Sequence, residues 1–161
     1  MKLKFLLSSC LLISLNLFAS GIKYPFDDIP KSLLKDAKAV VRNEDIVVEV
    51  NSNNKLVQKV TYAITILNKN GKSNGYFMHP YDKNMKVSGI RAQMFDKNGF
   101  EKKKKGGFDI LDYALIPDGS TYGDLRIKAI DPENFEYPYT VEYNYEVTLT
   151  EVIQYPGWYP V

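Results

Sequence analysis

Few residues of this 161-residue chain are suited to catalysis. It contains one histidine, His79, and one cysteine, Cys10. A serine or cysteine nucleophile needs a base beside it, and the chain has no Gly-x-Ser-x-Gly stretch or comparable setting. A metal site needs several His, Cys or clustered carboxylates. The adjacent acidic pair Asp27-Asp28 lies near the start of the mature chain with no further metal-ligating residues next to it in the sequence. The sequence therefore predicts a structural or surface role for His79, and no catalytic residue, metal site or cofactor.

Four residues are candidates for contact with a ligand or partner: Tyr122, Asp124, Arg126 and Trp158. Asp124 and Arg126 are two apart, so on a strand they point to the same face. They could form a structural salt bridge with each other, with Asp82 as a second acid for Arg126, or they could contact a ligand. Tyr122 and the Trp158 of Tyr-Pro-Gly-Trp-Tyr-Pro could stack on a sugar ring. The structural salt bridge is the favoured interpretation of the charged pair.

A run of four lysines, Lys102–Lys105, allows two interpretations. It could contact an acidic glycan, a lipid headgroup or an acidic partner. It could equally be a solvated strand end that prevents edge-to-edge pairing, because lysines on an edge strand disfavour association. The second is favoured, since the charge of the chain is balanced once its leader is removed.

The first twenty residues have the order of a secretory signal peptide. Lys2 and Lys4 precede a mostly apolar run, and small residues follow at 19–21, where cleavage is expected. The leader holds two of the 21 basic residues and no acid, so residues 21–161 carry 19 basic and 19 acidic residues. This balance gives no support for a nucleic-acid partner. Cys10 leaves with the leader, so the mature chain has no disulfide and no thiolate. We expect one exported domain over 21–161, with membrane contact only through the signal peptide.

The elements that must position these residues are mainly strands. In "YTVEYNYEVTLT" (139–150) apolar and polar residues alternate strictly, which predicts a strand with Tyr143, Tyr145 and Val147 inside and Glu142 and Glu146 in water. Other β-branched and aromatic runs predict further strands, with a bulge or a close backbone approach at Gly89. Asn-Gly turns predict hairpins at 70–71 and 98–99. One short helix is expected at 29–38. The fold class is mainly β: an antiparallel β-sandwich with one short N-terminal helix.

Several stretches together resemble a known family. "AKAVVRNEDIVVEV", "VTYAITILNKNGK", "YDKNMKVSGIRAQMFDKNG", "DLRIK" and "YPYTVEYNYEV…YPGWYP" are similar to the uncharacterised N-terminal domain of exported bacterial transglutaminase-like proteins, common in Bacteroidota. The resemblance covers roughly residues 29–161. It implies a β-sandwich in the periplasm or cell envelope of a Gram-negative bacterium, ahead of a papain-like catalytic domain.

The resemblance also limits the expected function. Family members continue past the point where this chain stops, so the Cys, His and Asp of the transglutaminase-like site have no counterparts here, and the sandwich is expected to be incomplete at the C-terminus. The chain is then a fragment of a longer product or a stand-alone remnant. The leading expectation is a non-catalytic module that scaffolds or positions a C-terminal transglutaminase-like domain or an envelope partner. The alternatives are a glycan- or peptide-binding module, and a fragment of a transglutaminase-like peptidase or cross-linking enzyme.

Overall fold

The computed structural model describes residues 21–115, 124–133 and 135–150. Eight strands make up most of this part of the chain: β1 (Ala39–Ser52), β2 (Lys55–Ile66), β3 (Phe77–Tyr81), β4 (Met85–Phe95), β5 (Glu101–Gly106), β6 (Leu111–Ala114), β7 (Arg126–Ile130) and β8 (Tyr139–Thr150). Four short 3-10 helices connect or precede them: η1 (Phe26–Asp28), η2 (Lys31–Leu33), η3 (Lys69–Gly75) and η4 (Gly107–Asp109). The predicted signal peptide lies outside the described residues. No helix of the described ranges is long and apolar enough to cross a membrane.

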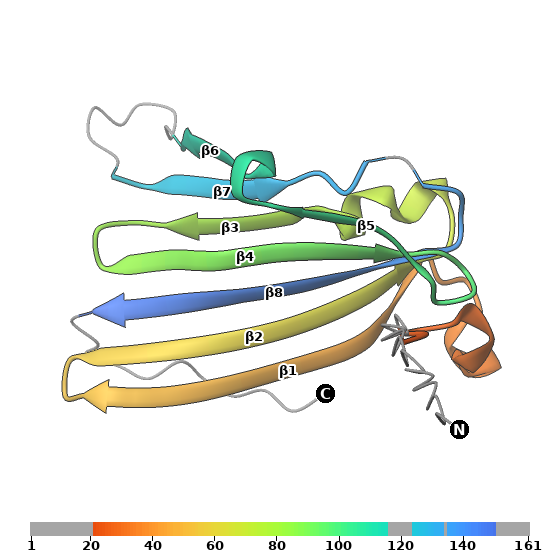
Figure 1. Ribbon diagram of the computed structural model, residues 1–161, viewed down its shortest axis with the longest axis horizontal. Coiled ribbons are helices and arrows are strands. Elements are labelled where there is room, and N and C mark those ends of the chain that lie inside the picture. The colour runs from red at the N-terminus through yellow and green to blue at the C-terminus, as the bar shows by residue number, and fades with distance from the viewer. Residues whose placement is uncertain (1–20, 116–123, 134, 151–161) are drawn as a thin grey trace, which may run out of the picture.

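The strands form two antiparallel sheets, which confirms the predicted β-sandwich class. One sheet has the order β1-β2-β8-β4-β5 and the other the order β3-β7-β6. The two sheets meet through Phe77 of β3, whose ring lies 5.3 Å from Tyr143 and 5.0 Å from Tyr145 of β8. In Figure 1, β3, β7 and β6 lie beyond β4, on the side away from β1. The smaller sheet therefore faces only part of the larger one.

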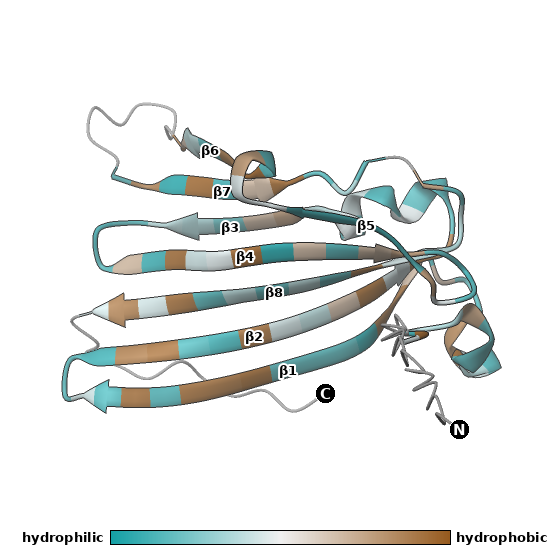
Figure 2. Ribbon diagram, viewed as in Figure 1, coloured by the Kyte–Doolittle hydropathy of each residue, from teal (hydrophilic) through white to brown (hydrophobic). Residues whose placement is uncertain are grey.

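The core follows from the alternation in β8. Tyr143 and Val147 are buried, as predicted, whereas Tyr145 is only partly buried. All three pack in or against one apolar cluster that also contains Tyr139 and Val141. The Tyr143 hydroxyl donates a 2.6 Å hydrogen bond to the Gly75 carbonyl, so this buried ring keeps its polar end satisfied. Figure 2 shows the resulting alternation of hydrophobic and hydrophilic positions along the central strands. Burial raises the pKa of the Tyr139 hydroxyl to about 12.

One of the two hairpins predicted from Asn-Gly turns is confirmed. Asn98-Gly99 joins the paired strands β4 and β5, and Gly99 has the positive φ of 85° that such a turn requires. The prediction for Asn70-Gly71 is wrong, because these residues lie in η3. β2 pairs with β1 and β8, and the chain leaves β2 for β3 in the other sheet.

Two further expectations concern backbone details. The bulge predicted at Gly89 is confirmed by a register shift between Ser88 and Arg91 in the β4–β8 pairing, with φ of 64° at Gly89. The helix expected at 29–38 is much shorter than predicted: helical turns are confined to η2, and Asp36 has a positive φ of 57°. A helix of two to three turns cannot continue through that conformation.

Candidate functional site

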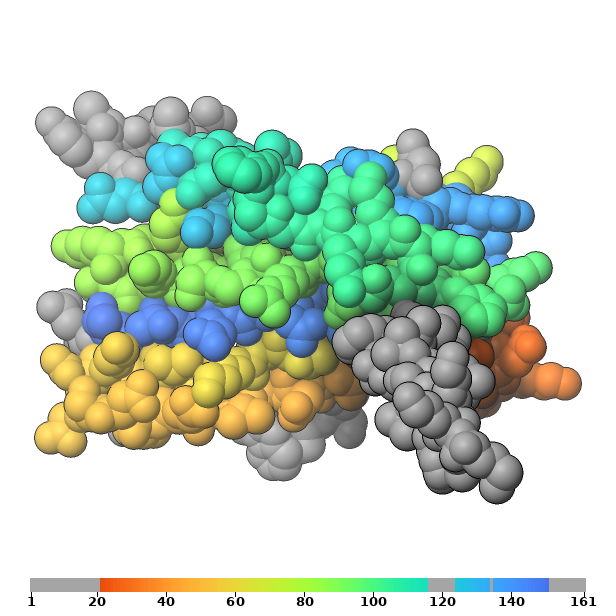
Figure 3. Space-filling model, viewed as in Figure 1, coloured from red at the N-terminus to blue at the C-terminus, as the bar shows by residue number. Residues whose placement is uncertain are grey.

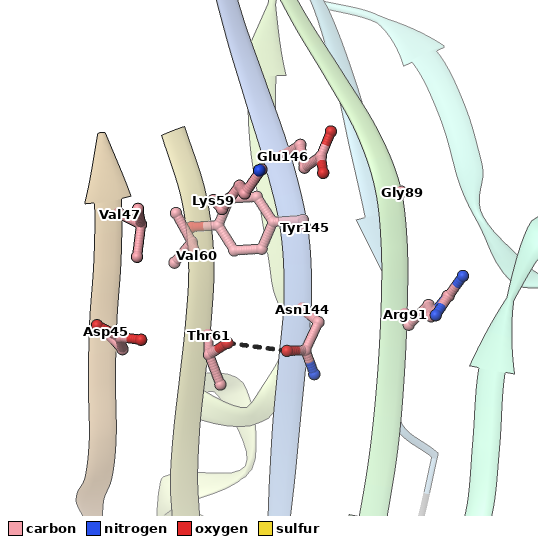
Figure 4. A pocket seen from close by; sticks show the side chains of 10 residues that line it. All are labelled: Asp45, Val47, Lys59, Val60, Thr61, Gly89, Arg91, Asn144, Tyr145 and Glu146. Atoms are coloured by element: carbon pink, nitrogen blue, oxygen red, sulfur yellow. Dashed lines mark hydrogen bonds between the residues drawn. The ribbon is translucent and has the colours of Figure 1, made fainter. Parts of the chain in front are cut away.

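A shallow polar hollow lies on the face of the five-stranded sheet that points away from β3. Its volume is about 330 Å³, and the residues that line it come from β1, β2, β8 and β4 (Figure 4): Asp45, Val47, Lys59, Val60, Thr61, Gly89, Arg91, Asn144, Tyr145 and Glu146. Thr61, Asn144 and Arg91 share one row because they are cross-strand partners. Figure 3 shows the side chains of β8 open to view between β2 and β4 on this face.

The chemistry that this hollow offers is charge and hydrogen bonding. The Thr61 hydroxyl donates a 2.9 Å bond to the Asn144 side-chain oxygen, and an amide oxygen is too weak a base to activate a nucleophile. The hollow can therefore hold polar groups between the carboxylates of Asp45 and Glu146 and the guanidinium of Arg91.

His79 lies on β3, in the other sheet. Its Nδ1 is 2.7 Å from the Pro80 carbonyl oxygen, and its ring lies 6.3 Å from that of Phe77 and 5.7 Å from that of Tyr145. These contacts fit the predicted structural role. Within the described ranges, no group of three or more His, Cys, Asp or Glu side chains is placed to hold a metal ion.

Arg126, at the start of β7, forms a salt bridge, but its partner differs from the predicted ones. Its Nε donates to Asp112 Oδ1 at 2.9 Å and to the Tyr81 hydroxyl at 3.0 Å. The Tyr81 hydroxyl and Arg126 hold the pKa of the Asp112 carboxyl below its ordinary value. Asp82, the other predicted acid, instead accepts from the backbone N–H groups of Asn84 and Met85 in the β3–β4 turn. Arg126 is thus tied to β6 and β3.

Of the remaining predicted contact residues, Asp124 is the one that lies in the described part of the chain. Asp124 is exposed and lies two residues before the start of β7. Tyr122 and Trp158 lie outside the described residues. The glycan- or peptide-binding surface that these residues would form stays a prediction.

The four-lysine run forms most of β5, an end strand of the larger sheet, and its charges are matched by nearby acids. Lys103 and Lys105 both contact Glu133 at 2.6 Å, Lys102 contacts Asp96 at 3.2 Å and Lys104 contacts Glu101 at 3.2 Å. The two lysines lower the pKa of the Glu133 carboxyl to about 2. These pairs favour the interpretation of the run as a solvated edge.

β8 contains a buried carboxylate, Glu142, which the alternation of the sequence wrongly predicted to face water. Glu142 was predicted to face water, but it is 2% exposed, because the segment at 22–26 lies over this end of the sheet. The Tyr24 hydroxyl donates to Glu142 at 2.6 Å, and Lys23 Nζ and the Asn144 amide donate at 3.2 and 3.1 Å. Burial alone would raise the pKa of Glu142, but these hydrogen bonds outweigh it and place the pKa below its ordinary value.

The same segment is fixed to the sheet along its backbone. Lys23 N–H donates to the Gly99 carbonyl at 3.0 Å, and Phe26 N–H donates to the Lys97 carbonyl at 2.8 Å. Arg42 of β1 donates to the Tyr24 and Pro25 carbonyls, each at 3.1 Å. This N-terminal strap, residues 22–26, therefore covers one end of the polar face and leaves the hollow beside Arg91 uncovered.

An exposed apolar strip on β1 is the second feature that sequence reasoning missed. Ile46, Val48 and Val50 pair with Val60, Gln58 and Leu56 of β2, which in turn pair with Tyr145, Val147 and Leu149 of β8. Cross-strand partners share a face, so the β1 residues lie on the core side of the sheet. They are nevertheless 49–56% exposed. We call Ile46, Val48 and Val50 the β1 strip.

Comparisons with known proteins place the chain in a family and identify a fold relative. The family model described as "Domain of Unknown Function with solved-structure structure (DUF3857)" matches residues 52–160. A crystal structure described as "a putative protease from Parabacteroides distasonis ATCC 8503" is similar in fold, with a TM-score of 0.60 and 14% sequence identity. The similarity covers 76% of this chain and 24% of that one, so this chain spans about a quarter of its structural relative. No curated protein matches at a significant level. Because the family model spans well over half of the sequence, the chain belongs to the DUF3857 family of domains.

Proposed function

We propose that this chain is a non-catalytic, exported β-sandwich module that positions a transglutaminase-like catalytic domain. The observation that carries the proposal is the β1 strip: three aliphatic side chains on the core side of the sheet, each about half exposed. The core-side residues of β8 at the centre of the same sheet are largely covered, and Tyr143 and Val147 are buried. Exposed aliphatic residues that continue a core face are typical of a surface that another domain covers.

The size of the strip fits a partner in the same polypeptide. Completing the burial of a half-exposed Val or Ile contributes roughly 1 kcal/mol, so the three residues offer about 3 kcal/mol. That corresponds to a dissociation constant in the millimolar range or weaker. A linked domain has an effective concentration of this order, whereas a free protein does not. The fold relative, of which this chain spans 24%, supports such an arrangement because most of its chain lies outside the shared module.

The charged sites of the module also fit a supporting role. The four lysines of β5 are matched by acids, and Arg126 is held by Asp112 and Tyr81. The Thr61 hydroxyl in the polar hollow is bonded to an amide. These interactions link strands to each other, and they give the module a fixed shape on which a second domain can rest.

The test compares two substitutions in the full-length protein as the source cell makes it. Val48→Lys places a charge on the β1 strip, and Val47→Lys places the same charge on the opposite face; the two valines are 50% and 47% exposed. In the product, Val48→Lys should release the partner domain, seen as faster proteolysis of the junction, while Val47→Lys should behave as the wild type.

Two results would contradict the proposal. One is equal proteolysis of the two variants. The other is cleavage or cross-linking of peptides by the isolated chain that His79→Ala abolishes. Urea unfolding of each isolated variant is the control, and both should unfold within about 0.5 kcal/mol of the wild type because the positions are exposed.

A further inference from the structure

The four end strands of the two sheets are not equally protected against pairing. β5 carries Lys102–Lys105, β3 contains Pro80 and β6 has four residues. Lysines, proline and shortness are the devices with which proteins prevent a free edge from taking up another strand. Each of these three edges therefore has one such device.

β1 has none of these devices along its central part. It is 14 residues long, and its register irregularities lie near its ends, between Val41 and Asn43 and between Val50 and Ser52. Residues 43–50 pair regularly with β2 and contain no Lys and no Pro. Val47 on one face and the β1 strip on the other are all 47–56% exposed. A long, regularly paired edge without lysine or proline is a template for a further strand.

We propose that the outer edge of β1, which no strand of the described residues pairs with, takes up an extended, lysine-bearing segment of a partner polypeptide as an additional strand. Backbone hydrogen bonds supply the affinity in this mode of recognition, and alternate side chains supply the specificity. The inference deepens the proposed function, since it names the contact through which the module holds its partner. It also supplies the affinity that the β1 strip lacks by itself.

The charge of β1 indicates a basic partner. Glu44, Asp45 and Glu49 lie in its central part. Among the salt bridges of the described residues, Lys59 of β2 pairs with Glu49 at 2.6 Å and with neither of the other two acids. Arg42 does not neutralise the other two, because its guanidinium donates to carbonyls of the N-terminal strap. Glu44 and Asp45 are exposed and adjacent, so they point to opposite faces. A lysine on either face of the added strand would meet a carboxylate, while its methylene groups cover valine.

A second copy of this chain fits the edge less well. Pairing β1 with β1 would gather three carboxylates from each copy in one ribbon, and residues 43–52 contain no basic side chain to separate them. Like charges on neighbouring strands are destabilising. The partner strand is therefore expected to differ from β1 in charge.

The experiment uses two synthetic peptides as probes, KVTVKVTVKV and EVTVEVTVEV, with fluorescence anisotropy as the readout. The lysine peptide should bind the mature chain at least tenfold more tightly than the glutamate peptide. A Glu44→Lys and Asp45→Lys double variant should reverse this preference. The matched control on the other end strand, Lys102→Glu with Lys104→Glu, should keep the wild-type preference.

Hydrogen exchange locates the bound peptide and separates this inference from the proposed function. Binding should slow exchange of β1 amides and leave β3 and β5 unchanged. Three results would overturn the inference: equal binding of the two peptides, protection elsewhere than β1, or a dimer whose β1 amides are protected without peptide. If neither peptide binds but Val48→Lys still releases the partner domain, the inference of strand addition at β1 is refuted and the proposed positioning role stands.

Discussion

Replacing Glu142 with alanine should destabilise the fold by about 2 kcal/mol. A hydrogen bond to a charged group contributes about 1.5–3 kcal/mol, and the 2.6 Å bond from Tyr24 is of this kind. The pair with Lys23 adds little, because the Lys23 side chain is 51% exposed and surface pairs contribute up to about 1 kcal/mol. The alanine variant no longer pays the desolvation cost of burying a charge. The expected loss in the free energy of unfolding therefore lies near the lower limit of the hydrogen-bond range given above.

Glu146 provides the matched control for this measurement. It lies four residues further along β8 on the same face, and it is exposed. Its replacement by alanine should change stability by less than about 0.5 kcal/mol. In urea unfolding followed by far-ultraviolet circular dichroism, a slope of roughly 2 kcal/mol per molar gives Glu142→Ala a midpoint about 1 M lower than wild type. Equal midpoints for the two variants would refute the assignment of Glu142 as a buried, bonded carboxylate.

The pH dependence of this effect has a defined sign. The folded-state pKa of Glu142 lies below its ordinary value, so the unfolded chain binds the proton more tightly. The stabilisation is present above the unfolded pKa of about 4.3 and is lost as the pH falls through the lower folded pKa. The difference in urea midpoint between wild type and Glu142→Gln should therefore be full near neutral pH and shrink below about pH 4. A difference that grows on acidification would contradict this reasoning.

Two further predictions follow from single sites. The carboxyl of Glu133 should titrate with a pKa of about 2 by nuclear magnetic resonance, and Lys103→Ala with Lys105→Ala should return it toward the ordinary value; an unchanged pKa in the double variant would contradict the contacts. Gly71→Ala should destabilise the chain by more than about 1 kcal/mol in urea unfolding, because a β-carbon there would overlap the Lys38 carbonyl oxygen. A neutral effect would show that η3 does not pack against this carbonyl.

Strand positions and faces were predictable where they depend on neighbouring residues. The alternation over 139–150 placed Tyr143 and Val147 inside correctly, and Asn98-Gly99 marked a true hairpin because the strands on either side of it pair with each other. Asn70-Gly71 has the same local chemistry. It does not form a hairpin because the strand after it joins a different sheet, which no local signal reveals.

Contacts between distant segments could not be predicted in the same way. Glu142 is buried by Lys23 and Tyr24, which precede it by more than a hundred residues. Arg126 was assigned an acid two residues away, but the strand pairing of β6 with β7 brings Asp112 to it instead. The exposed state of Val48 is likewise a consequence of which strands face β1, and the alternation of β1 itself gives no sign of it.

The measurement that tests the positioning role most directly is thiol labelling at Val48. The single cysteine of the sequence is Cys10, in the predicted leader, so Val48→Cys and Val47→Cys each introduce one thiol into the mature chain. Both should react rapidly with a maleimide in the purified chain, because the two side chains are about equally exposed. In the native complex of the source cell, labelling at position 48 should slow at least tenfold while labelling at position 47 stays fast. Rapid labelling at both positions in the native complex would contradict the proposal that the β1 strip holds a partner domain.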